Sequence, residues 1–340
     1  MSSSTRGPAK ARAHATSDGA RSSSTSSRRS TAAADRRVAA GAVLALDIGG
    51  TRCLAAVADS SGALGASQRL STPRASDAEE LFGAIASLCE RTIGDRGRVI
   101  TAIGVGCGGP MREGLVSPLH IPAWRDFPLR ARLAERFGIP CVVDNDAKAM
   151  ALGEWWLGAG RSSRAMLGMV VSTGVGGGLV IAGQLVDGAT GNAGHVGHVI
   201  AFPDGPECDC GAHGCVEAVA SGSAIARRYG GDVAAEVVAA RARARDPRAG
   251  QLFDEAGTAL GRGIAAAAAL CDLDRVVIGG GVALGAWDLL RPPLAAELAG
   301  AARLQFVRDL DVRPAELGER AGLLGAAALA LGLGRVLAPP

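Results

Sequence analysis

Apolar and polar positions alternate along this chain in blocks that predict strands and helices in turn. From Val43, the runs VLALDIGG and CLAAVADSSGAL are separated by glycines and are typical of a β-hairpin. Helical periodicity over 77–91 precedes an apolar run at 99–106, and an amphipathic stretch over 128–137 precedes the run CVVD at 141–144. This alternation predicts an α/β fold that is built in layers.

The same plan returns in the second half of the chain. After a helical stretch at 147–157, the run MLGMVVSTGVGGGLVIAGQL predicts a strand, a glycine-rich turn, a second strand and a Gly-Gln turn. The elements predicted after this run are helices at 232–245 and 250–270, the strand-like run RVVIGGG at 275–281, a helix that begins near Leu284 and an alanine-rich helix at 322–331. We therefore predict an internally duplicated architecture.

This duplication suggests where the parts of the chain begin and end. We expect a tail over 1–40, an N-terminal α/β domain over 41–146 and a C-terminal α/β domain over 147–340. The last helix, about 322–333, is expected to pack back on the N-terminal domain. The length of 340 residues and the 48% hydrophobic content are sufficient for two cores of ordinary size.

Positive charge is concentrated in the tail. Residues 1–40 hold eight Lys or Arg against two Asp, a net of +6, so the rest of the chain carries −3 of the total of +3. The tail is rich in Ser, Ala and Arg without apolar periodicity, which predicts disorder. The alternatives are an upstream extension from a misassigned start, a segment like an organellar transit peptide, and a weak nucleic-acid contact. We expect no nucleic-acid partner for the protein.

Hydropathy and cysteine placement also restrict the class of protein. No run approaches the roughly 18 to 20 apolar residues that a membrane span needs, so we expect no membrane partner. Three of the eight cysteines lie close together, and the other five are scattered in apolar surroundings. This pattern favours the reducing cytoplasm over a disulfide-bonded secreted protein.

The region 190–222 contains a His-x-x-His pair, three closely spaced cysteines and, after the last of them, Glu217. Cys208, Cys210 and Cys215, together with His198, supply the number and type of ligands that a closed tetrahedral Zn²⁺ site requires. The alternative is three ordinary buried cysteines, but the Pro, Gly and Asp around them indicate a loop. Glu217 follows closely and could face whatever this loop surrounds.

Glycine-rich turns follow three apolar runs. Glycine permits the tight backbone and the close approach with which main-chain N–H groups reach a phosphate. A glycine turn after a strand is also the ordinary form of a hairpin, so each turn alone is weak evidence. Asp47 could hold Mg²⁺ through water. The candidate nucleotide-binding residues are Asp47, Gly49, Gly50 and Thr51 in the first turn, Thr173, Gly174 and Gly176 in the second, and Gly279, Gly280 and Gly281 in the third.

Between the two hairpin units, VVDNDAKAMALGE predicts a strand that ends in three polar residues and a helix that follows. Asn145 and Asp146 stand at this junction, where Asp146 would project into a cleft between the domains. Asn and Asp at such a junction also serve as helix N-caps, and capping is the simpler explanation for either residue taken alone.

In combination, these motifs resemble the ROK family of bacterial sugar kinases and sugar-responsive repressors, over residues 43–335. The family lies within the actin/hexokinase/Hsp70 superfamily, which implies two actin/ribonuclease-H-like α/β domains around a central cleft, with a zinc-bearing loop. By this resemblance Asp146 is the catalytic base, Asn145, His198 and Glu217 contact the sugar, and His198 also binds a structural zinc. A homo-oligomer, dimer or tetramer, is implied by the family alone.

One departure from the family pattern concerns the substrate. Many members have Ala-Gly-Glu-x-Gly-His where this chain has an imidazole at His195. Bacterial N-acetylmannosamine kinases resemble this chain more closely here, so we interpret His195 as a further sugar-binding residue and expect an N-acylhexosamine substrate. The alternative is that His195 only packs within the loop and that glucose is the substrate.

We therefore predict an ATP-dependent kinase that phosphorylates the 6-hydroxyl of a hexose or N-acylhexosamine, N-acetylmannosamine being favoured. Its predicted cofactors are Mg²⁺, bound with ATP, and structural Zn²⁺. A glucokinase is the first alternative, and a non-catalytic sugar-sensing ROK regulator is the second. The segment 1–40 is too short and too polar to form the winged helix-turn-helix that a repressor needs.

Overall fold

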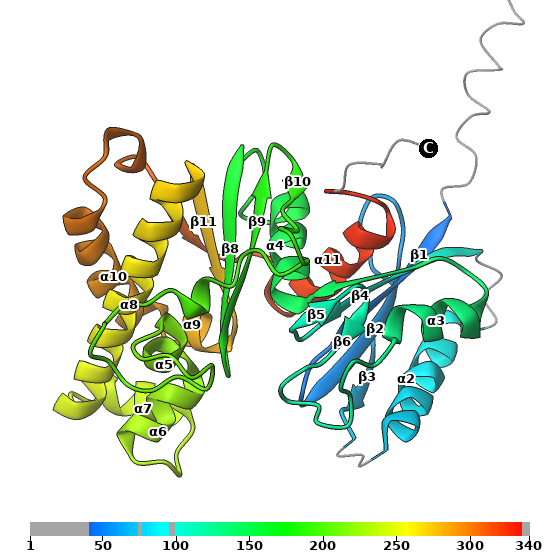
Figure 1. Cartoon of the computed structure of the whole chain (residues 1–340), viewed down its shortest axis with the longest axis horizontal. Coiled ribbons are helices and arrows are strands. Elements are labelled where there is room, and N and C mark those ends of the chain that lie inside the picture. Colours follow the sequence, from blue (N-terminus) through cyan, green and yellow to red (C-terminus); the bar gives the residue numbers. More distant parts are fainter. Residues whose placement is uncertain (1–40, 74–76, 95–98, 335–340) are drawn as a thin grey trace, which may run out of the picture. The chain divides into compact units, whose positions relative to one another are not determined.

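A computed structural model describes residues 41–73, 77–94 and 99–334 of the chain. The predicted disorder of the tail therefore concerns residues outside this part. Helices and strands alternate along it, which confirms the α/β class expected from the hydrophobic pattern (Figure 1). No helix among the described residues is long and apolar enough to cross a membrane.

The first sheet has the strand order β3-β2-β1-β4-β7. Strand β1 pairs antiparallel with β2, which pairs antiparallel with β3, whereas β4 runs parallel to both β1 and β7. A small hairpin, β5 with β6, follows β4. The bounds are β1 Ala42–Ile48, β2 Arg52–Ala58, β3 Gln68–Ser71, β4 Ile100–Cys107, β5 Met111–Arg112, β6 Leu115–Val116 and β7 Cys141–Asn145.

The second sheet repeats this plan with the order β10-β9-β8-β11-β12. Strands β8, β9 and β10 form an antiparallel series, and β11 runs parallel to β8 and to β12. The duplication expected from the two hairpin patterns is thus present in strand order and in strand direction. The bounds are β8 Ala165–Val171, β9 Val175–Ile181, β10 Gln184–Leu185, β11 Arg275–Gly279 and β12 Asp311–Pro314.

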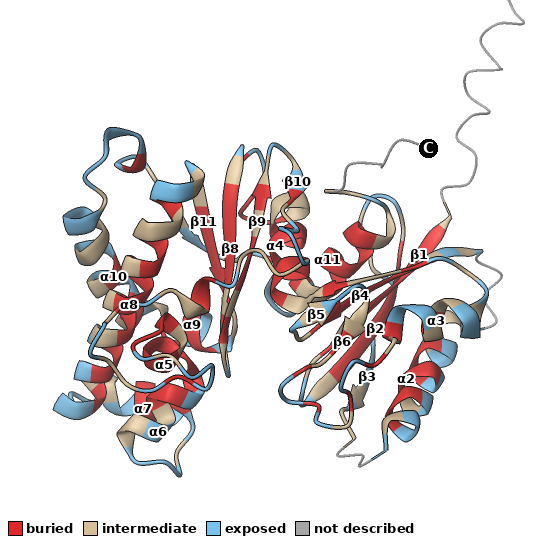
Figure 2. Ribbon diagram, viewed as in Figure 1, coloured by how far each residue is buried: buried red, intermediate tan, exposed pale blue. Residues whose placement is uncertain are grey.

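Helices cover both sheets, and each sheet has a core of buried apolar side chains (Figure 2). Helix α8, with Asp246 as its N-cap and Pro247 in its first turn, buries one apolar face on the second sheet. The helix bounds are α2 Ala78–Ile93, α3 Leu129–Phe137, α4 Asp146–Leu157, α5 Val216–Ala220, α6 Gly222–Tyr229, α7 Ala235–Arg243, α8 Pro247–Cys271, α9 Gly281–Gly285, α10 Trp287–Ala301 and α11 Ala321–Ala330, with short 3₁₀ turns η1 Val196–His198, η2 Gln305–Val307 and η3 Gly318–Arg320.

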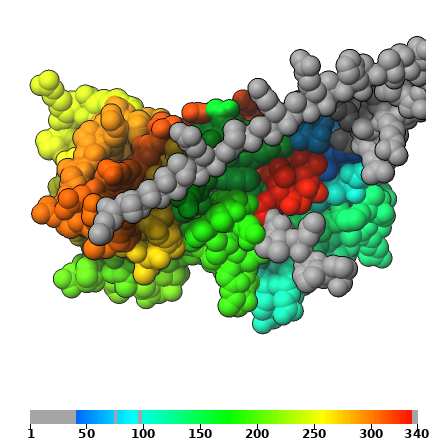
Figure 3. Space-filling view, turned by 90° about the horizontal axis from the view of Figure 1, so that it is seen from above, coloured from blue at the N-terminus to red at the C-terminus, as the bar shows by residue number. Residues whose placement is uncertain are grey.

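Two helices pack against each other between the sheets. Helix α11 lies on β1 and β4 of the first sheet, and α4 lies on β8 and β9 of the second. Figure 3 shows the surface of α11, in red, beside the blue of the first strands and the green of the middle of the chain. A Cβ atom on Gly325 of α11 would lie 1.7 Å from the main-chain oxygen of Ala149 in α4, so only glycine permits this approach. The C-terminal helix thus connects to the helix that begins at Asp146.

The structure also differs from the sequence expectations in places. Gln184, expected in a turn, begins β10, and the turn is made by Ala182 and Gly183, both with positive φ. The helix expected to begin near Leu284 begins at Gly281 as α9. The short elements β3, β12, α5 and α6 were not expected, because four to eight residues carry little periodicity of their own.

Candidate active site and metal centre

A cavity of about 410 Å³ is lined by residues that follow strands of both sheets. Gly279 is not among its lining residues, because it lies within β11, where a Cβ atom would meet Ala315 and Met150. The predicted residues that do line it are Asp47, Gly49, Gly50, Thr51, Asn145, Asp146, Thr173, Gly174, Gly176, His195, His198, Glu217, Gly280 and Gly281. Residues separated by more than 200 positions are thereby brought to one cavity.

The junction of β7 and α4 places two polar side chains in this cavity. The Asn145 side-chain oxygen is the N-cap of α4 and accepts from the N–H groups of Ala147 and Lys148, at 3.0 and 3.3 Å. Asp146 is the first helical residue, and its Oδ1 accepts from Ala147 N at 2.8 Å. Helix capping therefore accounts for the hydrogen bonds of the Asn145 side-chain oxygen. The second carboxylate oxygen of Asp146 is available to the cavity.

The first glycine turn brings Asp47 and a histidine to the same cavity. A Cβ atom on Gly50 would lie 2.4 Å from His120 Cβ, so the absence of a side chain lets His120 cover the turn. A Cβ atom on Gly322, in the first turn of α11, would lie 2.5 Å from Asp47 Oδ2. The Asp47 carboxylate therefore faces the N-terminal end of α11, where the helix dipole favours negative charge.

The two carboxylates of the site influence each other. The pKa of Asp47 is raised to about 6, mostly by burial and also by the charge of Asp146, whereas Arg52 lowers it. Burial also raises the pKa of Asp146, whereas the Ala147 N–H and the imidazoles of His120 and His195 oppose this rise. A carboxylate with a raised pKa is a better proton acceptor than one in water, which suits a general base.

The raised pKa of Asp47 predicts a stability change when the charge is removed. The folded protein binds the Asp47 proton more tightly than the unfolded chain, so this group stabilises the fold at low pH, and that contribution is lost as pH rises from about 3.8 to about 6. Above pH 6 the Asp47→Asn variant should therefore be more stable than wild type, by up to about 3 kcal/mol. Thermal unfolding in magnesium-free buffer between pH 4 and pH 8 measures the difference.

The exposed Asp309 supplies the control for this measurement, since Asp309→Asn should leave the unfolding curve unchanged. An Asp47→Asn gain that persists at pH 4, or a loss of stability at pH 7, would contradict the assigned burial of the charge.

The second glycine turn is held by Glu217. Glu217 Oε2 accepts from Val175 N at 2.7 Å, and a Cβ atom on Gly174 would lie 2.7 Å from the same oxygen. Glu217 lies in the first turn of α5, and the N–H of Gly222, at the start of α6, donates to Ser172 O at 2.7 Å. One oxygen of Glu217 thus fixes the turn, which leaves the other oxygen for a ligand in the cavity.

The loop that carries His195 and His198 packs directly over β9. A Cβ atom on Gly197 would lie 2.0 Å from Val175 O, and Gly194 has φ +98° and would meet Gly177 O at 2.8 Å. These two glycines permit a contact that brings both histidine rings to the cavity, with centroids 6.2 Å apart. The spacing of the His-x-x-His pair thereby places two imidazoles side by side.

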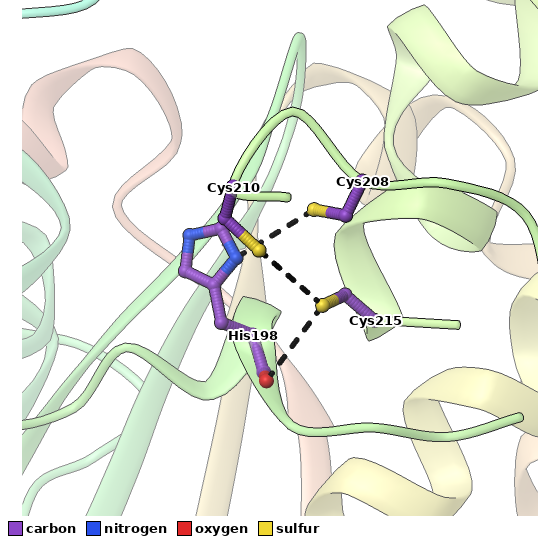
Figure 4. A group of neighbouring side chains, drawn as sticks. All are labelled: His198, Cys208, Cys210 and Cys215. Carbon is purple, nitrogen blue, oxygen red and sulfur yellow. Dashed lines mark hydrogen bonds between the residues drawn. The ribbon is translucent and has the colours of Figure 1, made fainter. Parts of the chain in front are cut away.

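The four predicted zinc ligands converge on one point (Figure 4). Their ligand atoms all lie within 4.8 Å of one another, with Cys210 Sγ 3.7 Å from Cys215 Sγ and Cys208 Sγ 3.8 Å from His198 Nδ1. Tetrahedral Zn²⁺ with bonds of about 2.3 Å to sulfur and about 2.0 Å to nitrogen has ligand separations of roughly 3.5 to 3.8 Å. The donor set therefore fits zinc, and all eight cysteines of the described chain are free thiols.

Three groups of cavity residues were not predicted as site residues. Gly108 and Gly109 follow β4, and a Cβ atom on Gly109 would lie 3.1 Å from Asn145 Nδ2. The Gly-Gly pair after the apolar run at 99–106 was the signal that could have found them. Only the fold reveals the approach of His120 to Gly50. The segment 318–322 has no sequence signal, since α11 brings it here by packing.

Comparisons with known proteins agree on one family. The sequence matches the ROK family over residues 43–332. It is 37% identical over 298 residues to the N-acetylmannosamine kinase of Shigella flexneri, covering 85% of this chain and 98% of that protein.

Two solved structures extend the likeness to the fold. The ROK hexokinase from Thermus thermophilus is 37% identical, with a TM-score of 0.76 and coverage of 85% of this chain and 98% of that one. The ROK family glucokinase from Streptomyces griseus, in complex with glucose and AMPPNP, is 32% identical, with a TM-score of 0.71 and coverage of 86% and 100%.

Proposed function

The chain belongs to the ROK family, and on this premise we propose that it is an ATP-dependent sugar kinase that transfers the γ-phosphoryl group of ATP to the 6-hydroxyl of N-acetylmannosamine. The observation that carries the proposal is the joint lining of one cavity by Asp146, both glycine turns and the two histidines. A sugar hydroxyl and a phosphate can meet there beside a carboxylate.

The predicted site residues have separate roles in this reaction. Asp146 accepts the proton of the attacking sugar hydroxyl. The hydroxyl oxygen forms the new bond to the γ-phosphorus as the bond between that phosphorus and ADP breaks. Asn145, His198 and Glu217 orient the sugar ring, and the main chain of the glycine turns binds phosphate. Catalysis then consists mostly of positioning.

Two metal ions would support these residues. Mg²⁺ bound with ATP would be held near Asp47 through water and would neutralise charge on the phosphates. Zn²⁺ held by His198 Nδ1 and the three cysteines would fix the tautomer of His198, so that Nε2 is presented to the sugar. Because ATP is the donor, we place the protein in the cytoplasm, and a homo-oligomer stays a prediction from family resemblance.

Substrate identity is tested by ADP release with ATP and Mg²⁺ across N-acetylmannosamine, N-acetylglucosamine, glucose, mannose and fructose. We expect kcat/KM for N-acetylmannosamine to exceed that for glucose by about tenfold or more, roughly the effect of one good hydrogen bond to a histidine. In His195→Glu, the carboxylate accepts from two sugar hydroxyls, so the preference should move toward glucose.

The exposed His213 lies outside the cavity lining, and His213→Glu is the matched control that should keep the wild-type preference. A wild-type preference for glucose would favour the glucokinase alternative, which the Streptomyces griseus structure with bound glucose supports. ADP release with none of the sugars would refute the proposed activity.

A further inference from the structure

Asn192 lies where the segment that carries His195 meets the β5–β6 hairpin. Its Nδ2 donates to Met111 O at 2.9 Å, and its Oδ1 accepts from Met111 N at 3.3 Å. The side-chain amide therefore pairs with both main-chain groups of one residue. Met111 begins β5 and packs against the core of the first sheet, whereas Asn192 follows β10 of the second sheet. This pairing joins the β5–β6 hairpin to the segment that follows β10.

The main chain of Asn192, in contrast to its side chain, contacts His195. The Asn192 carbonyl oxygen lies 2.8 Å from His195 Nδ1. A carbonyl oxygen can only accept, so Nδ1 carries the proton in this contact, and Nε2 is the nitrogen left for the cavity. Asn192 thus pairs with the β5–β6 hairpin through its side chain and fixes the ring of His195 through its main chain.

The base of the same segment is anchored by Lys148. Lys148 Nζ lies 2.7 Å from Asp187 Oδ1, 2.9 Å from Asp144 Oδ1 and 3.2 Å from Gly191 O, and the Lys148 side chain is 1% exposed. Lys148 belongs to the first turns of α4, the helix that begins at Asp146. The start of the segment is therefore fixed to α4, and Asn192 links the segment to the β5–β6 hairpin.

We propose that Asn192 is a positioning residue for the sugar. It joins the segment that carries His195 to the β5–β6 hairpin and thereby orients His195 toward the substrate. The proposal rests on the proposed function. Asn192 itself does not line the cavity. Without the Asn192 side chain, the segment keeps its anchor on Lys148 but loses its pairing with the β5–β6 hairpin. The sugar then loses an oriented partner, while the nucleotide turns stay in place.

The kinetic test compares Asn192→Ala and Asn192→Asp with wild type. Loss of the two hydrogen bonds to Met111 predicts a rise in sugar KM of about 10- to 30-fold, with the KM for ATP within about twofold of wild type. Asn192→Asp keeps the shape but places a carboxylate against the Met111 carbonyl, so it should not restore the sugar KM. Restoration by Asp, or equal rises in both KM values, would mean a space-filling or general structural role and would overturn the proposal.

Thr190→Val is the matched control, because it removes the bond from Asn192 Nδ2 to Thr190 Oγ1 at 3.2 Å and keeps the Asn192 side chain that pairs with Met111. It should leave the sugar KM within about threefold of wild type. A rise as large as that of Asn192→Ala would assign the effect to the segment in general and overturn the specific role of the Met111 pairing.

A second measurement is independent of turnover. Hydrogen exchange of the Met111 amide should accelerate in Asn192→Ala, because the amide loses its acceptor. The NMR signals of the His195 ring should also shift, and they can be assigned because the chain has five histidines. Unchanged exchange and ring signals would overturn the proposal even in an active kinase. If wild type phosphorylates no sugar, the proposed function fails, and these two signals still decide whether Asn192 joins the hairpin to His195.

Discussion

Replacement of Asp146 by Asn should lower kcat by about 10²- to 10⁴-fold, the usual contribution of a general base. The amide keeps the shape of the carboxylate and can keep the contact with Ala147 N, but it cannot accept the proton of the sugar hydroxyl. Binding of the sugar should be retained, because Asn145, His198 and Glu217 are unchanged. ADP release gives kcat, and titration calorimetry with the sugar gives the dissociation constant.

The same substitution should also raise the melting temperature at neutral pH. Burial raises the pKa of Asp146, which means that its ionised form is destabilising in the folded protein, and the neutral amide removes this cost. Asp126→Asn is a suitable control, since Asp126 is exposed and has φ +49°, a backbone conformation that Asn tolerates. An Asp146→Asn enzyme with a kcat within about tenfold of wild type would exclude Asp146 as the base.

Hydrophobic periodicity was sufficient to predict the duplicated fold, because each long strand and helix carries its own signal. The runs at 43–50 and 166–178 place an apolar strand before a glycine turn, and both turns line the cavity. The third turn shows the limit of such a motif. Gly280 and Gly281 line the cavity, whereas Gly279 is the last residue of β11. No pattern in the sequence Gly-Gly-Gly distinguishes the three.

Contacts between segments far apart in sequence could not be predicted in this way. Gly322 faces Asp47 because α11 returns to the first sheet, and His120 reaches Gly50 across 70 positions of sequence. The hold of Asn192 on Met111 uses main-chain atoms of its partner, so no side chain at position 111 signals it. Such residues are found only when the packing of the sheets is known.

Replacement of Cys210 by Ser should abolish stoichiometric zinc binding and lower the melting temperature by about 5 °C or more, because the free energy of metal binding is also free energy of folding. Cys210 is the informative ligand, since it is exposed whereas Cys208 and Cys215 are buried. A serine there removes a thiolate without opening a cavity in a core. Metal analysis of the purified variant and thermal unfolding measure the two effects.

Loss of the metal should further raise the sugar KM and leave the ATP KM nearly unchanged. His198 Nδ1 faces Cys208 Sγ at 3.8 Å, so without a metal the imidazole loses the partner that fixes its tautomer and ring position, and its other nitrogen is no longer held toward the sugar. The nucleotide turns follow β1, β8 and β11, so the two sheets hold them in place. Cys271→Ser, a free thiol outside the cluster, should change neither the metal content nor the sugar KM. Because the nucleotide turns follow strands of the sheets, whereas His198 belongs to the cluster, an equal rise in both KM values would show that the cluster supports the whole fold rather than the sugar loop. Undiminished zinc in Cys210→Ser would show that the four residues do not form the site.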